Sequence, residues 1–314
     1  MIEYFFSEGA NLKKIDIPSD GGWINMINPD ESEIQKISQR YMLDSDVIKD
    51  ALDLDERSRL DLDEEYTMIL VNIPALEEDR ETDLYTTIPL SIIVVDDVVI
   101  TVCSEPTPVL TRFREGMVRD FRTQMRSRFI LQILFRVATM FLGFLHAIDK
   151  KSEAIEERLT KSTRNKELYE LLKLEKSLLY FTTALKSNEA VMKKLFRTNL
   201  IRKYPDDSDL LEDVIVENEQ AIEMATIYSG ILSGLMDVYA SVISNNMNVI
   251  MKLLAVVTIV LSIPNIIFAA YGMNVNGKGM PFSTWTNGFS IIIILSLIIS
   301  VLVGVYFQKI SKLK

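Results

Sequence analysis

The stretch from Asp237 to Asn274 reads DVYASVISNNMNVIMKLLAVVTIVLSIPNIIFAAYGMN and decides the fold of this chain. Small and polar side chains, with one methionine, recur along it at alternating steps of four and three residues, the spacing of a heptad seam. The seam consists of Asp237, Ser241, Ser244, Asn248, Met251, Ala255, Thr258, Ser262, Asn265, Ala269 and Gly272. Nearly all other residues of 253–271 are Leu, Ile, Val, Phe or Ala, which predicts a membrane helix with one polar stripe. The stripe must face protein or water, because an unpaired polar group in hydrocarbon is costly.

Two apolar segments, 253–271 and 288–307, each match the length of about 20 residues that a helix needs to cross a bilayer. The first residues carry Glu3 and Glu8 where an export signal would carry positive charge, so no such signal is expected. Lysines concentrate on the flanks of the two segments rather than in the loop between them, where only Lys278 stands. The positive-inside rule therefore predicts a multi-pass protein of the inner or plasma membrane with both termini in the cytoplasm.

Composition narrows the function classes. Cys103 is the single cysteine, so no internal disulfide can form, and His146 is the single histidine, so no multi-histidine metal site can form within one chain. The net charge of -10 argues against a nucleic-acid partner and favours cations. Neither a phosphate-binding loop nor a zinc-protease motif occurs, and the chain is not expected to be an enzyme.

The patterning predicts an α+β membrane protein with a cytoplasmic α/β domain, a long helical stalk and two C-terminal transmembrane helices. Strands are predicted at 2–6, 23–27, 67–73, 88–95 and 98–103, and short helices at 43–54 and after Asn28, which is expected to cap the helix that follows it. Two antiparallel helices are predicted over 122–158 and 167–197, and aspartates near 206 are expected to cap a third that has no convincing stop before Tyr271. The predicted divisions are an α/β domain at 1–120, paired helices at 121–203, a stalk at 204–252, a first span at 253–274, an outer loop at 275–287, a second span at 288–307 and a basic tail at 308–314.

Acidic residues gather in the first domain. The segment 44–65 has ten acidic and three basic residues, and Glu77, Glu78 and Asp79 continue the pattern. Most of these side chains are expected to form a solvated surface. A minority could bind a hard divalent cation, which prefers oxygen ligands.

Two transmembrane helices per chain cannot enclose an aqueous path, so a pore requires several copies of the long helix around a common axis. The alternative is a dry contact between helices, in which the polar side chains bond across the interface. The pore is favoured by the chemistry of the stripe. Thr258, Ser262 and Asn265 supply neutral oxygens, and Met251 with Leu254 supplies an apolar constriction below them.

The chain resembles the CorA family of magnesium and cobalt transporters at these residues. The quartet Tyr271-Gly272-Met273-Asn274, at the end of the first of two C-terminal spans, is similar to the family signature. The segment 235–239, followed by Ser244-Asn245, Asn248, Met251-Lys252 and Leu254, is similar to the family's stalk-to-membrane sequence.

This resemblance implies a funnel-shaped homopentamer in the lipid bilayer that passes hydrated Mg²⁺ through a central pore. Gly272, Met273 and Asn274 would form the selectivity filter, with Asn274 at the outer mouth, and Met251 and Leu254 the gate. Asn248 and Asp237 would line the pore or stalk below the gate.

The resemblance also implies that Mg²⁺ is a regulatory ligand as well as the substrate. Asp213 would share a cation with an acidic residue of the neighbouring subunit, for which Glu77, Glu78 and Asp79 are the candidates. The alternative interpretation of Asp213 is an acidic residue favoured by the dipole of a helix in its early turns.

The outer loop departs from the family pattern. After Met280-Pro281 the family's best-known loops carry a glutamate, whereas this chain has Phe282, and no acidic residue occurs in 275–286. One alternative is therefore a Zn²⁺ or Co²⁺ transporter on the same scaffold, with or without proton coupling, and Ni²⁺ is also among the candidate ions. An alternative of another class is a membrane-anchored scaffold or sensor that transports nothing.

Overall fold

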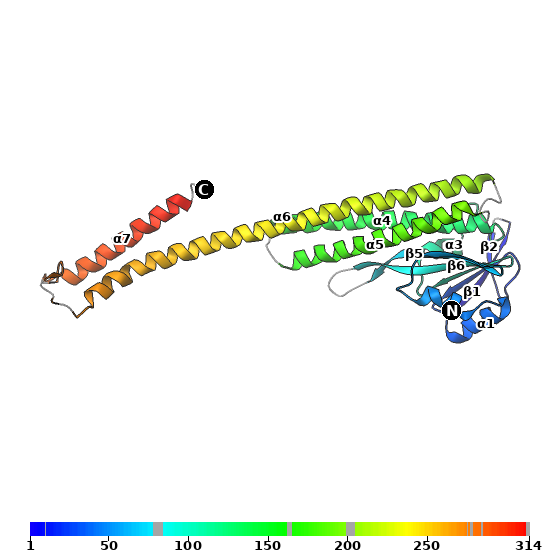
Figure 1. Ribbon diagram of the computed structural model, residues 1–314, viewed down its shortest axis with the longest axis horizontal. Helices are drawn as coiled ribbons and strands as arrows, with labels where there is room; N and C mark the ends of the chain where they lie inside the picture. The colour runs from blue at the N-terminus through cyan, green and yellow to red at the C-terminus, as the bar shows by residue number, and fades with distance from the viewer. Residues whose placement is uncertain are drawn as a thin grey trace. The chain divides into compact units, whose positions relative to one another are not determined.

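The computed structural model (Figure 1) describes residues 1–9, 11–77, 84–161, 165–198, 205–274, 276, 279–283 and 285–311. It divides into two compact units, Met1–Met236 and Asp237–Lys314. The helix α6, Pro205–Tyr271, contributes residues to both, and each unit is described by itself.

The first unit contains a seven-stranded sheet in the order β2-β1-β3-β7-β6-β5-β4. Neighbouring strands are antiparallel except β3 and β7, which are parallel and pair Trp23 with Val99. The strands are β1 Ile2–Glu8, β2 Asn11–Ile15, β3 Trp23–Ile27, β4 Arg59–Leu62, β5 Tyr66–Glu77, β6 Leu84–Val95 and β7 Val98–Cys103. All five predicted strands are confirmed. The two that were not predicted, β2 and β4, are the edges of the sheet, and with five and four residues they are too short for a clear strand pattern.

Short helices cover one face of this sheet. The predicted helix cap at Asn28 is wrong, because Asn28 adopts a left-handed backbone with φ of 41° and Asp30 caps the helix instead. The Asp30 carboxylate accepts from the Glu33 N–H at 2.9 Å, and the Glu33 carboxylate accepts from the Asp30 N–H at 3.1 Å, which completes a capping box. The elements on this face are α1 Glu31–Tyr41, α2 Ser45–Lys49 and the 3₁₀ turn η1 Asp50–Leu52. Alternate β7 residues, Val98, Ile100 and Val102, join the buried core beneath them.

The opposite face of the sheet is covered by α3 Pro108–Arg114, α4 Arg126–Lys161 and α5 Asn165–Arg197. Its core centres on Trp23, whose ring stacks on Phe5 at 4.8 Å and meets Phe129 edge-on at 5.3 Å. The Trp23 indole N–H donates to Thr101 Oγ1 at 2.8 Å, so the one polar atom of this side chain is paired.

The predicted long helices are confirmed, and α4, α5 and the first part of α6 lie side by side (Figure 1). The expectation that aspartates cap α6 is wrong for Asp207, which lies inside the helix and accepts a hydrogen bond from the Ser127 hydroxyl of α4. The buried positions of α6 in this unit follow steps of three, four and seven residues. They are Asp207, Leu211, Val214, Asn218, Ala221, Ala225 and Leu232.

The second unit consists of the remainder of α6, the outer loop and α7 Gly288–Ser311. Three helices of the described chain are long and apolar enough to cross a membrane, namely Arg126–Leu159 of α4, Asp207–Tyr271 of α6 and Gly288–Lys309 of α7. The apolar window is 56% buried in α4 but 0% in α6 and 17% in α7. The apolar window of α4 is therefore buried by packing in the first unit, whereas the apolar windows of α6 and α7 remain mostly uncovered by the described residues.

Candidate functional site

The helix α7 presents a narrow face of small side chains to α6. Its buried residues, Ile292, Ser296 and Ser300, recur every four residues, and Gly304 continues the series. A Cβ built on Gly304 would lie 3.5 Å from Val260 Cγ2, so the two helices are already in van der Waals contact there. Small residues allow membrane helices to approach closely.

The opposing face of α6 consists of half-buried apolar side chains spaced by three or four residues. They are Val256, Val260, Ile263, Ile267 and Tyr271. This face and the α7 series form one contact between the helices, which we call the α7 seam.

The predicted polar stripe lies on the other side of α6. Val260 follows Met251 by nine positions. At about 100° per residue, this places the two side chains roughly 180° apart around the helix. Asn248, Met251, Leu254, Thr258 and Asn265 are exposed, and only Ser262 is half-buried. The stripe is therefore free of α7 and available to water or to other copies of the chain.

The two hydroxyls of the stripe bond back to their own helix. Thr258 Oγ1 donates to the Leu254 carbonyl at 2.8 Å, and Ser262 Oγ donates to the Thr258 carbonyl at 2.7 Å. Each hydroxyl proton is thus used, and the lone pairs of each oxygen remain as acceptors. A row of such acceptors suits the water shell of a hydrated cation.

The signature Gly272-Met273-Asn274 follows directly after the last turn of α6. The Gly272 N–H donates to the Phe268 carbonyl at 2.9 Å, and Met273 and Asn274 beyond it are exposed. The last carbonyls of a helix carry partial negative charge and lack partners within the helix. The predicted filter therefore lies at the end of α6 that favours cations.

The outer loop is folded against the end of α6. Tyr271 Oη donates to the Pro281 carbonyl at 2.8 Å, and the rings of Phe282 and Trp285 meet edge-on at 5.4 Å. A Cβ on Gly288 would lie 2.1 Å from the Phe282 carbonyl oxygen, so only glycine fits this close approach. Lys278, the charged residue of the loop, lies outside the described residues.

The described regulatory candidates, Asp213 and Glu77, belong to the first unit, whereas the stalk residue Asp237 is exposed and opens the second. Asp213 is exposed on α6, and Glu77 is exposed at the end of β5. Glu78 and Asp79 fall outside the residues that the structure describes. Within the described part of one chain, no group of three or more His, Cys, Asp or Glu side chains is arranged to hold a metal ion.

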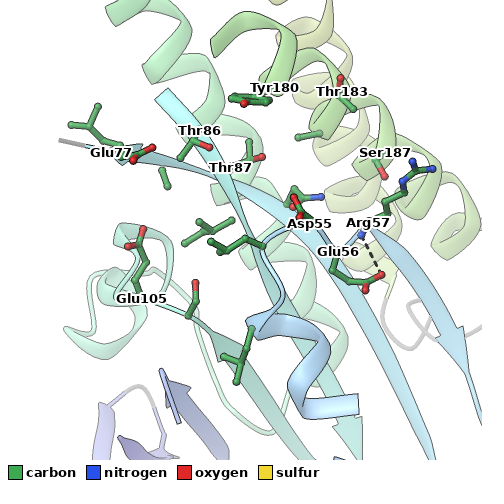
Figure 2. Close-up of a pocket in the computed structure, with 18 of the residues that line it drawn as sticks. Asp55, Glu56, Arg57, Glu77, Thr86, Thr87, Glu105, Tyr180, Thr183 and Ser187 are labelled. Atoms are coloured by element: carbon green, nitrogen blue, oxygen red, sulfur yellow. Dashed lines mark hydrogen bonds between the residues drawn. The ribbon is translucent and has the colours of Figure 1, made fainter. Parts of the chain in front are cut away.

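Glu77 lines an open groove of about 1170 Å³ whose walls come from β5, β6, α5 and the segment 52–57 (Figure 2). Asp55, Glu56 and Glu105 reach the same groove, whereas Asp213 does not line it. These carboxylates come from three separate chain segments, so no local sequence pattern could have brought them together.

A second acidic group was also not predicted. The Arg59 guanidinium is bound by Asp50, by Glu56 at 2.5 Å and by Asp61 at 2.7 Å. Burial raises the pKa of Asp50, although the charge of Arg59 opposes that shift. The only sequence signal was the density of carboxylates in 44–65.

Comparison with known families is consistent with this geometry. A family model described as CorA-like Mg²⁺ transporter protein matches residues 19–309, which is most of the chain. The chain belongs to the CorA family. A cobalt/magnesium transport protein CorA from Methanocaldococcus jannaschii is 27% identical over 291 residues, covering 91% of this chain and 90% of the relative. One from Thermotoga maritima is 22% identical over 327 residues, covering 98% and 90% respectively.

Solved structures show the same fold. The complete CorA magnesium transporter from Methanocaldococcus jannaschii superposes with a TM-score of 0.82 at 24% identity, covering 98% of this chain and 96% of that one. The full-length CmaX protein gives a TM-score of 0.71 at 15% identity, with 99% and 96% covered. The CorA fold therefore extends over both units of the chain.

Proposed function

We propose that this CorA-family chain is a channel or transporter that passes hydrated Mg²⁺ through a central pore in a homopentamer. The observation that carries the proposal is the position of the polar stripe of α6, on the side of the helix away from the α7 seam. The hydroxyls of the stripe donate only to their own helix, and its oxygens accept no hydrogen bond from the described side chains, which is explained if copies of α6 surround a water-filled path.

In this proposal the exposed residues of α6 act in order along the pore. Asp237 and Asn248 line its cytoplasmic part, Met251 and Leu254 form a hydrophobic gate, and Thr258, Ser262 and Asn265 provide the polar lining. Gly272, Met273 and Asn274 form the filter. Mg²⁺ gives up its water reluctantly, so a ring of Asn274 amides that binds the first-shell waters avoids the cost of dehydration.

The spans 253–274 and 288–307 would cross the cell membrane, with both termini in the cytoplasm. An inside-negative membrane potential contributes about 2.3 kcal/mol per charge per 100 mV, so inward flow of a divalent cation requires no chemical energy source.

We also propose that cytoplasmic Mg²⁺ closes the pore. Asp213 of one subunit and Glu77 of its neighbour, with Glu78 and Asp79 as further candidates, would share the ion. The exposure of both Asp213 and Glu77 leaves them available to another subunit. Loss of the shared cation at low Mg²⁺ would release the stalk helices.

The test is Mg²⁺ uptake into liposomes that contain the purified full-length chain. Asn274→Ala is expected to abolish uptake without dissolving the oligomer, because the filter loses its amide ring. Asn287→Ala is the matched control, since Asn287 is exposed before α7 and outside the stripe, and it should transport normally. Normal uptake by Asn274→Ala would refute the filter.

Ion competition separates the alternatives. Flux is measured with Mg²⁺, Co²⁺, Ni²⁺ and Zn²⁺ at several pH values. Preference for Zn²⁺ with a dependence on the proton gradient would favour the proton-coupled alternative. An intact oligomer that passes no divalent cation would favour the scaffold or sensor.

A further inference from the structure

One segment of this acidic chain is rich in arginine. Residues 112–136 carry seven arginines against two acidic residues, Glu115 and Asp120, although the whole chain has a net charge of -10. The seven are Arg112, Arg114, Arg119, Arg122, Arg126, Arg128 and Arg136.

Three of these arginines are paired. Arg114 Nη2 donates to the buried Glu3 carboxylate at 3.1 Å, and Arg126 lies 3.0 Å from the Asp97 carboxylate. Arg119 makes a longer contact of 3.6 Å with Asp120. The other four form no ion pair with the part of the chain that the structure describes. We call this set the arginine surface, and it comprises Arg112, Arg122, Arg128 and Arg136.

The arginine surface concentrates like charges. Arg128 and Arg136 are eight residues apart on α4 and so lie on one side of the helix, and Arg112 belongs to α3, which packs against α4. Burial and the nearby charge of Arg112 lower the pKa of Arg136. A guanidinium remains charged in proteins, so an anionic partner would relieve this repulsion.

The complementary surface lies on the segment 44–65, which the proposed ion pathway does not use. Two of its three basic residues are already paired, Lys49 with Glu31 and Arg59 with three carboxylates. Seven carboxylates are exposed, and we call them the acidic edge. They are Asp44, Asp46, Asp53, Asp55, Asp63, Glu64 and Glu65. Leu54 and Leu62 stand among them with 60% and 56% of their surface exposed.

The two surfaces are held at different parts of the sheet. Two contacts join the arginine segment to β1. Arg114 binds Glu3, and the Thr123 N–H donates to Ser7 Oγ at 3.0 Å. The acidic edge surrounds β4, which lies five strands away in the sheet order, or roughly 24 Å at about 4.8 Å per strand. No ion pair joins the two surfaces among the described residues.

We propose that the arginine surface of one copy docks on the acidic edge of a neighbouring copy. This head-to-tail contact uses two different patches, as a closed ring of identical subunits requires. Arginine binds carboxylates through two parallel hydrogen bonds, which adds direction to the attraction. The inference rests on the homo-oligomer of the proposed function and names the surfaces that would join its cytoplasmic parts.

The experiment measures the concentration at which the full-length chain in detergent is half assembled, by mass photometry at low and high salt. Arg128→Glu/Arg136→Glu should raise that concentration at least about tenfold at low salt, because like charges then face each other. Glu64→Arg/Glu65→Arg should do the same. The four substitutions in one chain restore opposite charges and should recover most of the assembly. High salt should narrow all these differences.

Lys186→Glu/Lys194→Glu is the matched control, because it makes the same change of charge at exposed positions of α5 and should leave assembly unchanged. Should the glutamate variant fail to fold, Arg128→Gln/Arg136→Gln removes the charges without reversing them and should still weaken assembly. The docking would be refuted, without affecting the homo-oligomer, if the charge-reversed variants assemble like the wild type. It would equally be refuted if the chain with all four substitutions does not recover assembly. A wild-type chain that never assembles would overturn the homo-oligomer as well.

Discussion

Replacing Asn188 with alanine is expected to destabilise the first unit strongly. Asn188 is buried on α5, and its side-chain amide pairs with both backbone groups of Asn72 in β5. The Asn188 Oδ1 accepts from the Asn72 N–H at 2.9 Å, and Nδ2 donates to the Asn72 carbonyl at 2.7 Å. The edge strand β4 pairs with β5 only as far as Arg59 opposite Leu70, so it does not extend to Asn72. The side chain of Asn188 completes the pairing where the strand stops.

The magnitude follows from these contacts. Asn188 makes three hydrogen bonds, two with Asn72 and one accepted from Ser58 Oγ at 2.8 Å. After truncation the Asn72 N–H retains Ser58 Oγ at 3.2 Å, but the Asn72 carbonyl has no comparable substitute. It points to the same side of β5 as the N–H, where the pairing with β4 ends at Arg59 opposite Leu70. At about 1 kcal/mol for each bond, the free energy of unfolding should fall by about 3 kcal/mol.

Tryptophan fluorescence during urea unfolding measures this loss. Trp23 is fully buried in the core of the first unit, whereas Trp285 is 63% exposed in the second, so a Trp285→Phe background isolates the signal of Trp23. With a slope of about 3 kcal/mol per molar urea, the midpoint should fall by about 1 M. Ser187→Ala is the matched control, because its hydroxyl makes only a 3.4 Å contact with the Ser58 carbonyl. A loss below about 1 kcal/mol for Asn188→Ala would refute the reasoning.

Three further predictions concern acid stability, the outer loop and regulation. Burial raises the pKa of Glu3, but its basic partners outweigh that effect and hold the pKa below 4.5. The wild type should therefore be more stable than Glu3→Gln above pH 4.5, and this difference in the free energy of unfolding should shrink as the pH falls further. Urea titrations at several pH values measure the difference, and a difference that does not change with acid would contradict this prediction. Gly288→Ala should lower the melting temperature and Mg²⁺ uptake by pushing Cβ into the Phe282 carbonyl, whereas Gly279→Ala, with no atom within 4 Å, should do neither. Asp213→Ala should weaken the protection that Mg²⁺ gives the cytoplasmic part against protease, and an unchanged digestion midpoint would remove it from the regulatory site.

The sequence predicted the elements whose pattern repeats over many residues. The apolar runs of β6, β7 and α7 and the three- and four-residue spacing of α4, α5 and α6 are local signals, and the structure confirms these strands and helices. The helix cap was assigned to Asn28 because a proline follows it, and proline is favoured in the first turn of a helix. The deciding signal was Glu33, three residues after Asp30, which closes the capping box.

Contacts between distant segments could not be predicted in the same way. The pairing of Asn188 with Asn72 joins positions 116 residues apart, and nothing in either neighbourhood indicates the other. The groove at Glu77 likewise depends on how α5 lies across the sheet. The stripe on α6 could be predicted because it repeats along one helix, whereas its position away from α7 required the structure of the seam.

The α7 seam also shows how one long helix can serve two purposes. In the first unit α6 is buried at Val214 and Asn218, and in the second unit its α7 seam includes Ile263 and Ile267. Ile263 follows Val214, and Ile267 follows Asn218, by a whole number of heptads. The contacts that α6 makes within the chain therefore fall in one heptad register in both units. The polar stripe occupies the other register, which also contains Asp213 when the pattern is extended toward the start of α6. Contacts within the described chain therefore use one register and leave the other free of them, which is the division that the proposed pore-lining role of α6 requires.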